Sequence, residues 1–81
     1  MKEISKDSFY ELSEEDANKF TGIVRYSNTE VVYFENGKWH RIDGPAHVMT
    51  DDVCSYWIHD VKTTKEGMEL YFSLLKLKSL L

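Results

Sequence analysis

The sequence predicts an α+β fold: an antiparallel β-meander of about five strands, with a short N-terminal helical turn and a C-terminal helix. Three observations lead to this prediction. Residues 22–58 alternate short β-branched and aromatic runs with turn residues. The same part of the chain repeats itself at an offset of 22 or 23 residues. Residues 66–81 instead place apolar side chains at helical spacing.

The length of 81 residues allows one domain, 1–81. We divide it into an acidic N-terminal cap (1–20), two β-hairpin repeats (21–62) and a C-terminal helix (63–81). A chain this short buries only about 60% of the surface that it exposes when unfolded. Its core must therefore be small.

The N-terminal cap carries six acidic residues against three lysines. Ser13 is followed three residues later by Asp16, which is the form of a capping box. The pattern predicts a short helix over 14–19. The side chains that we expect to face the core from this region are Phe9, Leu12, Ala17 and Phe20.

The β region begins at Gly22. The runs 23–26 and 31–34 predict a hairpin, and Asn36-Gly37 then predicts a type I′ turn, because both residues tolerate positive φ. Residues 38–41 are expected to form a third strand or an extended return. After a turn at 43–45, strands are expected at 46–49 and 53–58.

Two copies of one pattern make up this region. Residues 22–26 match 44–48, and residues 33–37 match 56–60. Each copy reads as glycine, strand, polar turn, strand with an aromatic pair, and tight turn. Such repeats stack so that neighbours share a buried face, and the flanking segments are expected to act as caps.

The C-terminal segment opens with Thr63-Thr64-Lys65-Glu66, which has the form of a second capping box. A stripe of Leu70, Leu74, Leu77 and Leu81 follows, with Met68, Tyr71, Phe72 and Leu75 beside it. This apolar arc is wider than one small sheet covers. We expect the surplus to bind a second copy or a protein partner. The alternative is that residues 77–81 fray at the terminus or fold back over the N-terminal turn beside Phe9 and Leu12.

Composition excludes several function classes. The net charge of −4 argues against a nucleic-acid partner. No apolar run approaches the ~20 residues that a transmembrane helix needs, and the N-terminus does not resemble a signal peptide. The one cysteine, Cys54, rules out an internal disulfide, fits a reducing cytosol and is expected to be buried. No cofactor motif is present, and the spacing of His40, His47 and His59 matches no metal-site pattern.

A family resemblance is carried by NGKWHRIDGPA, residues 36–46. It resembles the N-G-K-x-H-R-x-D-G-P-A repeat of small tailed-bacteriophage proteins, which is distantly similar to the MORN repeat. The matching residues are Asn36, Gly37, His40, Arg41, Asp43, Gly44, Pro45 and Ala46. The chain departs from the family where His59-Asp60 replaces a second Asn-Gly. The resemblance implies two MORN-like hairpins in a bacteriophage accessory protein that acts in the host cytoplasm.

The polar residues of this motif allow two interpretations. His40, Arg41 and Asp43 would be a general base, an anion clamp and an orienting carboxylate in a small hydrolase or ligand-binding enzyme. In the alternative, Asp43 caps its turn, Arg41 pairs with a carboxylate, and His40 bonds to backbone. We favour the structural interpretation, because turn chemistry alone explains the spacing.

The expected function is a non-enzymatic protein-binding module that inhibits or redirects a host protein, such as a defence factor. Besides the four leucines of the C-terminal helix, the aromatic residues Tyr33, Trp39 and Trp57 are candidates for partner binding. A self-assembling structural component remains an alternative. The acidic cap also allows a DNA mimic, which we do not favour because the net charge is modest for that role.

Overall fold

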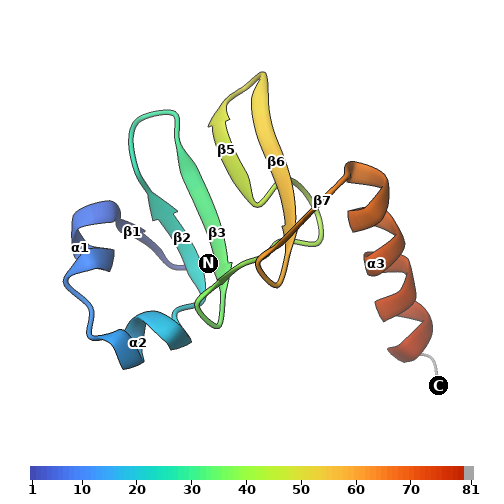
Figure 1. Ribbon diagram of the computed structural model, residues 1–81, viewed down its shortest axis with the longest axis horizontal. Coiled ribbons are helices and arrows are strands. Elements are labelled where there is room, and N and C mark those ends of the chain that lie inside the picture. The colour runs from blue at the N-terminus through green and yellow to red at the C-terminus, as the bar shows by residue number, and fades with distance from the viewer. Residues whose placement is uncertain (80–81) are drawn as a thin grey trace.

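The computed structural model describes residues 1–79 and has the expected α+β architecture (Figure 1). Its elements in this range, in chain order, are β1 (Glu3–Ser5), α1 (Lys6–Tyr10), α2 (Glu14–Lys19), β2 (Gly22–Arg25), β3 (Val31–Glu35), β4 (Lys38–Trp39), β5 (His47–Thr50), β6 (Val53–Ile58), β7 (Val61–Thr63) and α3 (Lys65–Ser79). A mostly antiparallel sheet with a C-terminal helix is therefore confirmed.

The strands follow the order β1-β2-β3-β5-β6-β7, and the two-residue β4 pairs with β3 outside this path. Every pair is antiparallel except β1 with β2, which is parallel. The sequence did not predict β1, α1 or β7. Each is five residues or fewer. Segments this short show no clear hydrophobic period, and the middle residue of β1, Ile4, is only half-buried.

The two repeats are visible as the β2–β3 and β5–β6 hairpins, which stand side by side (Figure 1). A two-residue turn follows each hairpin. Asn36 and Gly37 have φ of 50° and 77°, and His59 and Asp60 have φ of 47° and 68°. All four residues are in the left-handed region expected of a type I′ pair. The predicted turn at Asn36-Gly37 is confirmed, and His59-Asp60 is its counterpart.

The hydrophobic core lies under the first repeat. It consists of Phe20, Val24, Val32 and Phe34, against which Phe9 and Leu12 are packed. The second repeat has no comparable buried cluster among residues 1–79. Met49 and Val53 near the tip of its hairpin are 45% and 52% exposed.

The expectation that Cys54 is buried is wrong, because its side chain is exposed. It pairs with Val48 in the outer half of the second hairpin, where the adjoining Val53 is exposed as well. The alternation of side chains along a strand shows that neighbouring residues face opposite sides of the sheet, but it does not show which side is covered.

Side-chain caps begin all three helices. At α1, which the sequence did not predict, Ser5 Oγ accepts the Ser8 N–H at 3.1 Å. Ser13 Oγ accepts the Asp16 N–H at 3.1 Å, so α2 begins where the sequence predicted. The cap of α3 is one residue later than predicted: Thr64 Oγ1 accepts the Gly67 N–H at 3.0 Å. Thr63 is not the cap, because it is the last residue of β7 and pairs with Tyr56.

Helix α3 packs against β6, at the opposite end of the molecule from α1 and α2 (Figure 1). Residues 65–79 therefore do not fold back over Phe9 and Leu12, and that alternative is wrong for this range. No helix within residues 1–79 has the length and apolar content to cross a membrane.

The first prediction concerns the Asn36-Gly37 turn. Gly37→Val should lower the free energy of unfolding by more than ~1 kcal/mol, because a β-branched residue is strained at positive φ. A Cβ at Gly37 would also lie 2.7 Å from Asn18 backbone atoms. Asn36→Gly is the control and should change stability by only a few tenths of a kcal/mol. Equal thermal melts for Gly37→Val and the wild type would contradict the turn geometry.

Candidate functional site

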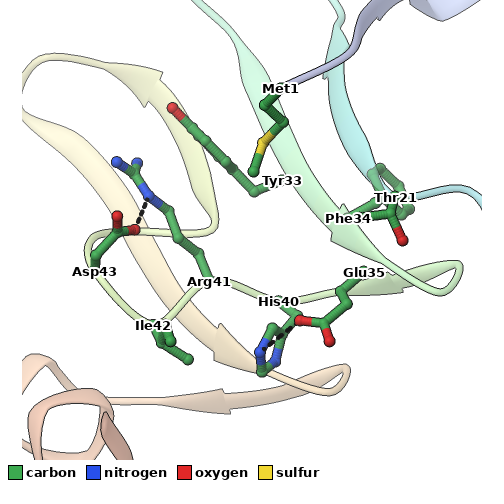
Figure 2. Close-up of a pocket in the computed structure, with 9 residues that line it drawn as sticks. All are labelled: Met1, Thr21, Tyr33, Phe34, Glu35, His40, Arg41, Ile42 and Asp43. Carbon is green, nitrogen blue, oxygen red and sulfur yellow. Dashed lines mark hydrogen bonds and ion pairs between the residues drawn. The ribbon is translucent and has the colours of Figure 1, made fainter.

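A pocket of about 230 Å³ lies where the first repeat passes into the second (Figure 2). Its lining comes mainly from β3 and from the segment that leaves β4. The residues are Met1, Thr21, Tyr33, Phe34, Glu35, His40, Arg41, Ile42 and Asp43. All three candidate polar residues of the sequence motif therefore line one pocket.

The His40 ring is buried, with 8% of the residue exposed. Its Nδ1 accepts the backbone N–H of His59 at 3.0 Å, and its Nε2 lies 3.0 Å from a Glu35 carboxylate oxygen. Because Nδ1 acts as an acceptor, the neutral ring carries its proton on Nε2 and donates it to Glu35. The predicted bond from His40 to backbone is confirmed.

Burial is the largest effect on His40 and lowers the pKa of its imidazole below the ordinary value. Glu35 acts in the opposite direction and raises this pKa, while His59 lowers it further. The geometry agrees with the net direction. A proton on Nδ1 would remove the acceptor that holds the His59 N–H. The His40 ring is therefore held in its neutral form.

A second contact links this histidine to the C-terminal helix. The rings of His40 and His59 are stacked, with centroids 4.1 Å apart. His59 Nε2 lies 3.1 Å from the Tyr71 hydroxyl of α3. The His40–His59 pair therefore joins β3, the β6–β7 turn and α3 in one chain of contacts.

Arg41 makes a second, separate cluster. Its guanidinium lies 4.0 Å from the Tyr33 ring centroid, its Nε donates to Asp43 at 2.8 Å, and its Nη1 donates to the Pro45 carbonyl at 3.2 Å. A Cβ on Gly44 would lie 2.8 Å from Arg41 Cζ. Gly44 thus leaves room for the guanidinium, and its φ is not in the left-handed region.

The expected role of Asp43 needs a correction. Its carboxylate bonds the Arg41 side chain rather than capping its own turn, and it is 73% exposed. The predicted pairing of Arg41 with a carboxylate is confirmed. An exposed pair of this kind is worth only ~0–1 kcal/mol, so Asp43 orients Arg41 more than it stabilises the fold.

These side chains share a pocket without converging on one point. His40 and Arg41 are neighbours in an extended segment, and their side chains leave it in opposite directions (Figure 2). His40 pairs with Glu35, and Arg41 pairs with Asp43. A base, an anion clamp and an orienting carboxylate acting together would need to surround one reacting atom. The geometry here fits two structural pairs.

One of these partners, Glu35, could have been found from the sequence, given the Asn36-Gly37 turn. A two-residue turn places Glu35 opposite Lys38, and Glu35 and His40 then lie diagonally on one face. The same register places Tyr33 opposite His40, so it does not predict that the Tyr33 ring contacts Arg41. No sequence signal pointed to the contact between His59 and Tyr71, because it depends on how α3 packs.

The three aromatic candidates are half-buried. The Trp39 ring centroid lies 5.0 Å from both Trp57 and His47, while Tyr33 lies under Arg41. Each of the three rings thus already has a contact within the chain. Within residues 1–79, no group of three His, Cys, Asp or Glu side chains is placed to hold a metal ion. His47 instead bonds Glu30 at 2.8 Å.

The leucine candidates lie outside this pocket, on α3. Leu70, Leu74 and Leu77 are 62%, 54% and 60% exposed. We call these three residues the leucine stripe. Leu81, the fourth predicted member, lies outside the described residues.

The second prediction tests the Arg41 cluster with a double-mutant cycle. Gly44→Ala should cost about 1 kcal/mol in the wild type, because it displaces the guanidinium from Tyr33 and Pro45. In an Arg41→Ala background the same change should be neutral or stabilising, since alanine only reduces the freedom of the unfolded chain. Urea unfolding measures all four proteins. An equal cost in both backgrounds would contradict the cluster.

The third prediction concerns pH. Because folding lowers the pKa of His40, its contribution to stability is complete above the unfolded value of about 6.5 and is lost as pH falls through the folded value. His40→Asn keeps an acceptor for the His59 N–H but does not titrate. Between about pH 7 and pH 5 the wild type should lose stability more steeply than this variant. Parallel profiles would show that His40 is not the cause.

Comparison with protein-family models, with curated proteins and with solved structures finds no match to this chain in any of the three.

Proposed function

We propose that the protein is a non-enzymatic protein-binding module, and that the leucine stripe of α3 is its binding surface. The observation that carries this proposal is the exposure of three leucines on one helix, each more than half accessible. Burying one such side chain fully is worth ~1.5–3 kcal/mol. A contiguous exposed apolar patch usually marks an interaction site.

The stripe is distinct from the face by which α3 is attached. Met68 is the buried residue of α3 within 65–79, and Tyr71 contacts the His40–His59 pair. At about 100° per residue, Leu70, Leu74 and Leu77 fall within a narrow arc, and Met68 lies well outside it. The chain therefore uses one apolar face of α3 to hold the helix and leaves the other facing outward.

The pocket at the repeat junction supports the non-enzymatic part of the proposal. Both ring nitrogens of His40 already have partners, and Arg41 is engaged by a ring, a carboxylate and a carbonyl. A small hydrolase acting through His40, Arg41 and Asp43 would have to break these contacts first. We therefore rank the enzyme below the binding module.

The identity of the target rests on the motif alone. The likeness of residues 36–46 to the bacteriophage repeat supports an accessory protein that works in the host bacterial cytoplasm. Its proposed action there is to inhibit or redirect a host protein, for example a defence factor. A groove that accepts an amphipathic helix is the kind of site that the stripe would fit.

The fourth prediction tests protein binding through the stripe. The tagged wild type, incubated with a bacterial lysate or with an untagged second copy, should retain a partner that Leu74→Glu loses. Leu75→Glu is the matched control, because it is the same change one residue along, outside the stripe. Partners should be identified by mass spectrometry. Equal retention by wild type and Leu74→Glu, or no partner of either kind, would refute the proposal.

A further inference from the structure

We infer that the partner of the leucine stripe is a second copy of this chain, bound so that the two α3 helices run antiparallel about a two-fold axis. This inference rests on the proposed function and names the occupant of its surface. Three features support it: the spacing of the stripe, the charges along α3 and the position of α3 in the molecule.

The stripe has the spacing of a helix–helix seam. Leu70 and Leu74 are four residues apart, and Leu74 and Leu77 are three apart. Alternation of four and three keeps side chains on the line along which two helices pack against each other. Leu75 lies off this line and is 39% exposed. A binding surface for an irregular loop would not need this periodicity.

The charges on α3 favour an antiparallel copy. The first part of the helix holds Lys65, Glu66 and Glu69 and has a net charge of −1, whereas Lys76 and Lys78 near its end are both basic. In an antiparallel pair the acidic part of each helix lies alongside the basic part of the other. A parallel pair would place like charges at the same level. The helix dipoles also oppose each other favourably only in the antiparallel arrangement.

The position of α3 leaves room for a second copy. The helix forms one end of the molecule, beyond β6 and β7, and the rest of the sheet lies on its other side (Figure 1). A two-fold contact uses the same surface on both partners, so one accessible stripe is sufficient. One short helix from each copy makes a small interface, so we expect a weak dimer with a dissociation constant on the order of 10 µM.

The fifth prediction is measured by sedimentation equilibrium of the full chain at about 5 to 200 µM, a range that spans this constant. The wild type should dimerise, Leu74→Glu should be monomeric throughout, and Leu75→Glu should dimerise like the wild type. Circular dichroism confirms that each variant keeps its helix. Raising the salt concentration should weaken the wild-type dimer, because its end charges attract.

Charge reversal tests the orientation. Glu66→Lys with Glu69→Lys makes every charged residue of α3 basic, and Lys76→Glu with Lys78→Glu leaves Lys65 as its one basic residue within 65–79. Each double variant should dimerise at least about tenfold more weakly than the wild type, and an equimolar mixture should recover the association. Unchanged self-association of either variant, or a dimer that salt strengthens, would overturn the antiparallel arrangement.

The results separate this inference from the proposed function. A wild type that is monomeric throughout the range overturns the second copy as occupant. If that monomer still captures another protein through Leu74, the binding function stands and only its partner changes. If it captures nothing, both fail.

Discussion

The return segment between the two repeats, residues 39–41, makes backbone contacts that join the second repeat to the first, in addition to the pairing of β3 with β5. Its Trp39 carbonyl accepts the Asp60 N–H at 2.9 Å, and its Trp39 N–H donates to the Asp60 carboxylate. Its Arg41 N–H donates to the Trp57 carbonyl at 3.2 Å. The second repeat lacks a buried cluster like that of the first, so these polar contacts hold it where hydrophobic burial contributes little.

The same contacts explain two residues with unfavourable backbone angles. His59 and Asp60 both have positive φ, although neither is glycine, which costs ~1–2 kcal/mol for each residue. The His59 N–H is held by His40, and the Asp60 N–H and carboxylate are held by Trp39. Three hydrogen bonds thus offset the strain of the turn. The segment HRIDGP, residues 40–45, therefore helps to hold one repeat against the next, through the contacts of His40 and Arg41.

Local patterns in the sequence predicted local structure well and tertiary contacts poorly. The pair Asn36-Gly37 favours one turn type, and a serine three residues before an aspartate favours a helix N-cap at Ser13. Both features could therefore be predicted from neighbouring residues. The parallel strand β1 could not, because its partner is about twenty residues away and it buries little. The exposure of Cys54 and the contact between His59 and Tyr71 depend on which faces the helices cover. Packing decides that, and strand alternation does not show it.

His40 and its neighbours hold the two repeats together. Amide hydrogen exchange of the native protein tests this role most directly. If these contacts hold the repeats together, the amides of Arg41, His59 and Asp60 should exchange as slowly as the most protected amides of β2 and β3, because all would open only on global unfolding. Fast exchange at these three amides, with β2 and β3 still protected, would show that the repeats separate freely and would contradict this role.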